Sequence, residues 1–189
     1  DRVRAIFPNA GVRNSYGTTE TGPAMFGPHP GGAPRPQLSI GYPYLGVEWR
    51  LVGPGAPDEG ELETRTPATL TGYKNLPDVN AKRHVDGWYK TGDVLRRDEQ
   101  GFFHFIGRVD DMFVCGGENV FPGEVEKLLE RHPAVLQAAV VAVDDEIKGA
   151  IPVAFVTRTP GSRVSVEELK AFALEQGPAF SHPRAIEFL

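Results

Sequence analysis

Residues 107–126 read GRVDDMFVCGGENVFPGEVE, and this stretch decides how the second half of the chain folds. The Gly116-Gly117 pair stands between two short β-prone runs, which predicts a hairpin with a type I′ turn. Pro122 fits the first turn of a helix, and Val125 and Leu129 recur on one helical face. Charged residues just before the glycines also suit a hinge that swings a glycine-lined surface toward a ligand. Both interpretations remain open at this point.

The residues that follow predict a compact α+β unit. Ala138–Val143 and Val153–Thr157 are uniformly apolar and β-prone, so we expect two buried strands. Ser165-Val166-Glu167-Glu168 has the spacing of a capping box and predicts a helix that runs to Gln176. Residues 108–189 therefore form one predicted domain.

The first part of the chain predicts turns and short strands. Its 189 residues include 22 glycines and 17 prolines, and both residue types favour turns. Short apolar or alternating runs predict the strands of a small antiparallel sheet or barrel, at 47–52, 61–65, 69–73 and 102–106. Residues 77–84 predict one short helix. The predicted fold class is α+β, with the β-barrel-like part in residues 1–107 and the α+β part in 108–189.

Composition excludes several classes of protein. The chain is 40% hydrophobic and 24% charged with a formal net charge of −5, so collagen, coiled coil and wholesale disorder do not fit. It has no excess of basic residues that would bind nucleic-acid phosphates without regard to sequence, and no nucleic-acid partner is expected. It contains no apolar run of about 18 residues, so no membrane span is expected. A single cysteine, Cys115, allows no internal disulfide, and we expect a cytoplasmic protein.

A first candidate for chemistry is the stretch Tyr16-Gly17-Thr18-Thr19-Glu20-Thr21-Gly22. An aromatic ring can stack on a base, and hydroxyls and backbone amides can donate to phosphate oxygens. Glu20 can hold Mg²⁺, which prefers a carboxylate together with phosphate oxygens. The alternative is a polar turn that leaves a strand.

A second candidate is Asp86-Gly87-Trp88-Tyr89-Lys90-Thr91-Gly92-Asp93. An acidic residue after a strand and a glycine turn can accept two hydrogen bonds from a ribose diol. The alternative makes Asp93 a turn cap and places Trp88 and Tyr89 in the core.

Taken in this order, the three segments resemble the adenylate-forming superfamily of acyl- and aryl-CoA synthetases, peptide-synthetase adenylation domains and firefly-type luciferases. The matches are its Tyr-Gly-x-Thr-Glu, Gly-Trp-x-x-Thr-Gly-Asp and Gly-Arg-x-Asp-Asp motifs, with connecting pieces such as Gly72-Tyr73. The sequence of residues 110–119 resembles the corresponding segment in the CoA ligases of fatty, benzoic and related acids. By this resemblance, residues 1–107 end the large AMP-binding domain, and residues 108–189 form a mobile lid that lacks its last segment.

The resemblance implies a role for each matching residue. The residues implied to bind ATP or AMP are Asn14, Tyr16, Gly17, Thr18, Thr19, Asp93 and Arg108. Tyr16 would stack on adenine, Thr19 would contact the α-phosphate, and Asp93 and Arg108 would hold the ribose. Glu20 is the implied Mg²⁺ ligand and Asp110 the implied hinge. Gly116 and Gly117 would line the tunnel for the pantetheine arm of CoA.

The implied activity is that of an ATP-dependent carboxylic acid–CoA ligase, with ATP, Mg²⁺ and CoA as cofactors and an acyl-adenylate as intermediate. The family's phosphate loop and adenylation lysine match nothing in these residues, so we expect this chain alone to be inactive. Two alternatives remain. One is an adenylation domain that loads a carrier-protein thiol, and the other is a non-catalytic nucleotide-binding module of the same fold.

Overall fold

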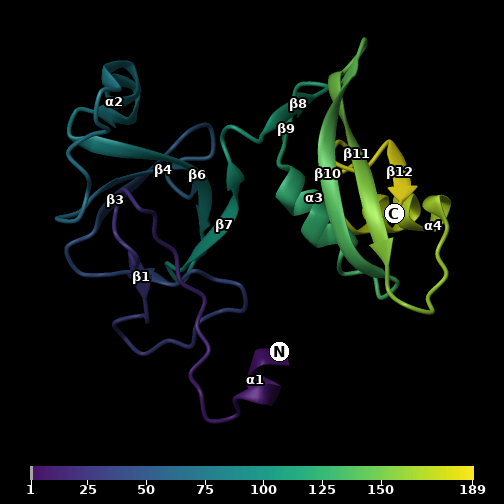
Figure 1. Ribbon diagram of the computed structural model, residues 1–189, viewed down its shortest axis with the longest axis horizontal. Coiled ribbons are helices and arrows are strands. Elements are labelled where there is room, and N and C mark those ends of the chain that lie inside the picture. The colour runs from purple at the N-terminus through teal and green to yellow at the C-terminus, as the bar shows by residue number, and fades with distance from the viewer. Residues whose placement is uncertain (1) are drawn as a thin grey trace. The chain divides into compact units, whose positions relative to one another are not determined.

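The computed structural model describes residues 2–189, and Figure 1 shows the helices and strands. The chain divides into two compact units, of which the first ends at Phe105 and the second begins at Ile106. No helix within residues 2–189 is long and apolar enough to cross a membrane.

The first unit is built on an antiparallel sheet with the strand order β3-β4-β6-β5, and β7 also pairs with β6. Its elements are α1 (Arg2–Ile6), β1 (Phe26–Gly27), β2 (Tyr42–Pro43), β3 (Glu48–Val52), β4 (Glu59–Arg65), α2 (Pro77–Arg83), β5 (His84–Val85), β6 (Trp88–Arg97) and the start of β7 (Phe103–Arg108), which continues past the division. The short helix expected over 77–84 is confirmed as α2. The core of the first unit contains Phe26, Leu62, Leu95 and Phe103.

The expected strand over 69–73 is wrong, because other groups take its main-chain hydrogen bonds. The Leu70 amide donates to the Glu20 carbonyl at 2.7 Å. The Tyr73 amide donates to the Asn80 side chain at 2.7 Å, and that side chain donates back to the Tyr73 carbonyl at 2.9 Å. The segment is therefore a loop held against α2.

The second unit confirms the predicted order of hairpin, helix, two strands and helix. Its elements are β8 (Phe113–Cys115), β9 (Glu118–Val120), α3 (Pro122–Leu129), β10 (Val135–Asp145), β11 (Gly149–Arg158), α4 (Val166–Gln176) and β12 (Ala185–Phe188). β12 was not predicted, and it pairs in parallel with β11. Ser165 and Glu168 form the predicted capping box at the start of α4. The α+β class is confirmed.

The two strands expected to be buried are buried on one face alone. Ala138 and Val140 of β10 are 7% and 6% exposed and share a core with α3 and α4. Val141 and Val143 are each 43% exposed. Successive strand residues point to opposite faces, and the helices pack against one of them.

The sheet of the second unit has the strand order β10-β11-β8-β9, so β10 is one of its borders, and Glu126 of α3 and Glu130 just after α3 accept hydrogen bonds from its backbone. The Val140 amide donates to Oε1 of Glu126 at 2.9 Å. The Ala138 amide donates to Oε1 of Glu130 at 3.2 Å. The two glutamates thus supply the hydrogen-bond acceptors that a further strand would otherwise provide.

Candidate functional site

The stretch Tyr16–Gly22 forms a tight polar turn in the first unit. The Thr18 and Thr21 hydroxyl oxygens lie 2.9 Å apart, and the Thr21 amide donates to the Thr18 carbonyl at 3.3 Å. A Cβ at position 17 would lie 2.6 Å from the carbonyl oxygen of Pro23, so only glycine fits there. Thr19 is exposed on this turn.

Two predicted site residues that are distant in the sequence meet in the fold. The Tyr16 hydroxyl donates to Oδ2 of Asp93 at 2.5 Å. Asp93 lies within β6 and is 5% exposed, so it belongs to a strand rather than to a turn. The Tyr16 ring packs edge-on against Phe26, with centroids 5.7 Å apart. This bond joins the first motif to the second.

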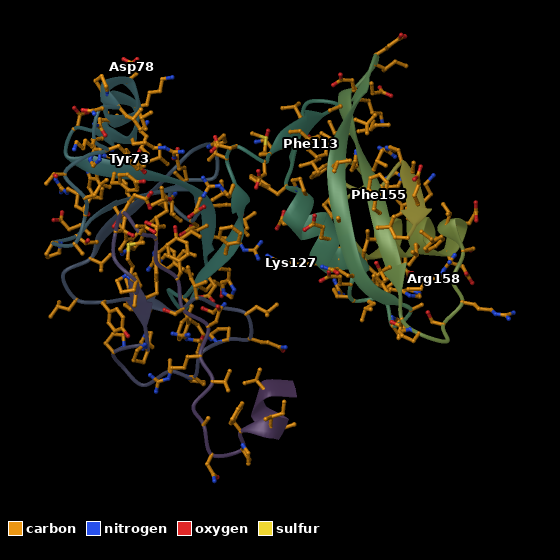
Figure 2. The ribbon with its side chains drawn as sticks, in the orientation of Figure 1. Tyr73, Asp78, Phe113, Lys127, Phe155 and Arg158 are labelled. Atoms are coloured by element: carbon orange, nitrogen blue, oxygen red, sulfur yellow. The ribbon has the colours of Figure 1, made fainter. Side chains whose placement is uncertain are left out.

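Glu20 is held by a residue that the sequence did not single out. The Tyr73 hydroxyl donates to Oε1 of Glu20 at 2.8 Å, and its oxygen lies 3.0 Å from the hydroxyl of Tyr89. The hydrogen bond from Tyr73 lowers the pKa of Glu20, so this carboxylate is ionised near neutral pH. Burial raises the pKa of Tyr89, which therefore keeps its proton. Figure 2 shows Tyr73 beside α2, which carries Asp78.

The Gly116-Gly117 segment of the third motif forms a hairpin in the second unit. Cys115 pairs with Glu118 across a two-residue turn, and Gly116 and Gly117 have φ values of +62° and +91°. This is the expected hairpin, and the positive φ values account for both glycines. A Cβ at position 117 would meet no atom within 4 Å. The space beside Gly117 is open within its own unit.

The remaining predicted site residues lie on exposed segments. Arg108 and Asp110 are 3.5 Å apart, with 41% and 66% of their side chains exposed. The Asn14 side chain donates to the Leu38 carbonyl at 3.4 Å, and the Asn14 carbonyl accepts a hydrogen bond from Arg35. Cys115, which is not one of the predicted site residues, is 2% exposed and forms part of the core. Among residues 2–189, no three His, Cys, Asp or Glu side chains gather as a metal site.

Comparison with known proteins gives the family. Residues 124–189 match the AMP-binding enzyme C-terminal domain. Over 184 residues the chain is 40% identical to the fatty acid–[acyl-carrier-protein] ligase ScoC of Streptomyces coeruleorubidus, covering 92% of the chain and 35% of that protein. The chain belongs to the adenylate-forming superfamily. It spans about a third of the length of the curated relatives that it matches.

Two further relatives of this adenylate-forming chain are CoA ligases. Over 182 residues it is 36% identical to the 2-succinylbenzoate–CoA ligase of a Geobacillus species, covering 94% of the chain and 37% of that protein. The o-succinylbenzoate CoA synthetase of Bacillus subtilis, solved with its acyl-adenylate intermediate, matches with a TM-score of 0.82 and 30% identity. That match covers 93% of this chain and 37% of the other.

Proposed function

We propose that this chain is the carboxy-terminal part of an ATP-dependent carboxylic acid–CoA ligase. In the first half-reaction, a carboxylate oxygen attacks the α-phosphorus of ATP, and pyrophosphate leaves as the acyl-adenylate forms. In the second, the thiol of CoA attacks the acyl carbon and loses its proton, a thioester forms, and AMP leaves. The named relatives act on fatty and aromatic acids, and we propose the same broad class here.

The observation that carries this proposal is the hydrogen bond from Tyr16 to Asp93. It brings an aromatic ring and a buried carboxylate together from segments 77 residues apart. In our proposal the ring stacks on adenine, and Asp93 accepts hydrogen bonds from the ribose hydroxyls. A carboxylate offers about four acceptor positions, so it can accept hydrogen bonds from more than one donor.

The phosphate end of the nucleotide is assigned to the neighbouring turn. Thr19 is exposed there and can donate its hydroxyl to the α-phosphate, while Gly17 and Thr18 contribute the shape of the turn. The backbone amides of such a turn are natural donors to an anion. Asn14, just before the turn, is assigned to the edge of adenine.

Glu20 fits Mg²⁺ only together with oxygens of the substrate. Its carboxylate is ionised, and within the described residues it belongs to no group of three or more His, Cys, Asp or Glu side chains. Mg²⁺ in nucleotide enzymes is commonly held by one or two carboxylates plus substrate phosphates, which matches a single carboxylate beside a phosphate-binding turn. When bound, the ion would neutralise phosphate charge.

In the second unit we assign three further roles. Arg108 contacts the ribose, Asp110 is the hinge about which the lid turns between half-reactions, and the Gly116-Gly117 turn receives the pantetheine arm. The open space beside Gly117 supports the last assignment, because a thiol arm needs a surface without side chains. Residues 108–189 are accordingly proposed as the lid and the residues before them as the end of the AMP-binding domain.

A second acceptor has support from one comparison. ScoC, at 40% identity, is named as a ligase that transfers a fatty acid to an acyl-carrier protein. The thiol would then belong to a carrier protein rather than to free CoA. The first half-reaction and its residues would be unchanged.

The test measures the two half-reactions separately in the intact enzyme. Exchange of labelled pyrophosphate into ATP, with a panel of fatty and aromatic acids, reports adenylation. Release of AMP on adding free CoA, and not a carrier protein, identifies the acceptor. Tyr16→Phe is expected to weaken ATP binding about tenfold, because the variant loses a hydrogen bond to a buried carboxylate. Absence of exchange with every acid would contradict the proposal.

A further inference from the structure

Tyr73 holds the Glu20 side chain from outside its own turn, while Thr18 also donates to that carboxylate and the charge of Arg83 attracts it. Tyr73 comes from the loop before α2, 53 positions along the chain. Its contact is at a single carboxylate atom, Oε1, at 2.8 Å. We propose that Tyr73 is a positioning residue that fixes how the Glu20 carboxylate faces the cation. This inference rests on the proposed function, in which Glu20 is the cation ligand.

The main-chain amide and carbonyl of Tyr73 are both hydrogen-bonded, and these bonds anchor its loop. The Asn80 side chain accepts from the Tyr73 amide at 2.7 Å and donates to its carbonyl at 2.9 Å. A Cβ on Gly72 would lie 3.2 Å from the Asn80 side chain, so glycine permits this close approach. The amide of Leu70 also holds the Glu20 carbonyl at 2.7 Å. The phenol therefore reaches Glu20 from a fixed base.

The number of protons available shows which hydroxyl donates in each hydrogen bond made by Tyr73 and Tyr89. A tyrosine hydroxyl has one proton, and that of Tyr73 is directed to the Glu20 carboxylate, which can only accept. The hydroxyl of Tyr89, 3.0 Å away, must then donate to the oxygen of Tyr73. Tyr89 is 4% exposed, so this bond satisfies a buried donor. The order of donation is Tyr89 to Tyr73 to Glu20.

This chain of donors limits the rotation of the carboxylate. A glutamate side chain that is free to move samples many rotamers, and ordering it on cation binding costs conformational entropy, which weakens the binding. With Oε1 held by Tyr73 and a further hydrogen bond from Thr18, the carboxylate of Glu20 has fewer orientations open to it. Loss of the phenol oxygen should weaken cation binding without removing any group that touches the nucleotide.

Two variants with one control test this in the intact enzyme. Tyr73→Phe and Tyr89→Phe each remove one oxygen, and Tyr42→Phe removes one from a tyrosine whose ring contacts His29 and Phe102 instead. We expect the Mg²⁺ concentration for half-maximal adenylation to rise about fivefold to tenfold in Tyr73→Phe. Tyr89→Phe should raise it about twofold, since it acts through Tyr73. Tyr42→Phe should leave it unchanged.

A binding measurement separates this inference from the proposed activity. Electron paramagnetic resonance of Mn²⁺, titrated into the intact enzyme with ATP, should show the same order of affinities without any turnover. Equal Mn²⁺ affinity in Tyr73→Phe and the parent overturns the positioning role. Normal cation binding without adenylation of any acid overturns the proposed function and leaves the positioning result standing.

Slow hydroxyl exchange provides the spectroscopic signature. In the 189-residue chain with ¹³Cζ-labelled tyrosine, the signal of Tyr73 in mixed H₂O and D₂O should split, because its hydrogen-bonded proton exchanges slowly. Glu20→Ala should abolish that splitting and leave the signal of Tyr42 as it was. If Tyr73 exchanges as fast in the parent as in Glu20→Ala, the proposed bond is absent in solution and the inference fails.

Discussion

Replacing Arg50 by alanine is expected to cost the first unit much more stability than replacing Arg65, although both cations lie over the same ring. Their guanidinium carbons are 4.5 Å and 4.2 Å from the centroid of Trp88. The difference lies in their carboxylate partners. Nε of Arg50 donates to Glu63 at 2.7 Å, and Glu63 is 2% exposed. Arg65 pairs at 2.5 Å with Glu48, which is 60% exposed.

The magnitude follows from what each variant leaves behind. Arg50→Ala leaves a buried carboxylate whose other cation, Lys90, is 3.7 Å away. Breaking a buried ion pair costs about 3–5 kcal/mol, and the remaining lysine brings our expectation to about 2–3 kcal/mol. Arg65→Ala breaks an exposed pair worth up to about 1 kcal/mol. Loss of the contact with Trp88 is common to both variants and cancels in the comparison.

Tryptophan fluorescence during urea unfolding measures this difference within the first unit. The chain has two tryptophans, Trp49 and Trp88, and both belong to that unit. With a slope of about 1–3 kcal/mol per M urea, Arg50→Ala should lower the midpoint by about 1–2 M. Arg65→Ala should lower it by about 0.5 M or less. Equal shifts in the two variants would refute the argument that the buried carboxylate sets the cost.

Gly117→Ala should destabilise the second unit by about 1–2 kcal/mol, since its φ is +91°, and should also slow thioester formation while pyrophosphate exchange persists. Gly161→Ala is the control, because it has a φ of +80° and equally open surroundings, and it should lose similar stability with no effect on thioester formation. Burial alone would raise the pKa of Asp98, but hydrogen bonds from His104 and two backbone amides outweigh it and lower that pKa. A lowered pKa in the folded state stabilises the protein above the ordinary pKa of the group, and this contribution is lost as the pH falls through the lowered value. The stability gap between the parent and Asp98→Asn, from urea midpoints, should therefore be full at pH 7 and shrink below about pH 4. A constant gap, or a thioester defect in Gly161→Ala, would contradict these expectations.

Local signals in the sequence predicted α2, α3 and α4, whereas α1 was not predicted. Pro122 and the capping box at Ser165 act within one turn of the backbone, so their effect can be read without knowledge of the fold. The apolar run over 138–143 was less informative. A run of apolar residues does not tell which face the helices cover, and Val141 and Val143 prove exposed.

The sequence predicted the motifs of the candidate site but not the contacts between their residues. The sequence pointed to Tyr16, Glu20 and Asp93, but the contacts between them depend on sheet pairing. Tyr73 was missed because its partner Glu20 is 53 residues away and its own segment looks like a strand. The signal that could have found it was the Gly72-Tyr73 pair, which matches the family.

The two glutamates that accept hydrogen bonds from the β10 amides, Glu126 of α3 and Glu130 just after it, also affect how copies of the molecule could associate. An uncovered strand border is a template for pairing with a strand of another molecule, and long apolar strands are the most dangerous in this respect. β10 is long, and Val141 and Val143 leave it apolar on its exposed face. Glu126 and Glu130 occupy the amides of Val140 and Ala138, which an incoming strand would need. These two hydrogen bonds should make the β10 border a poorer template for pairing with another strand.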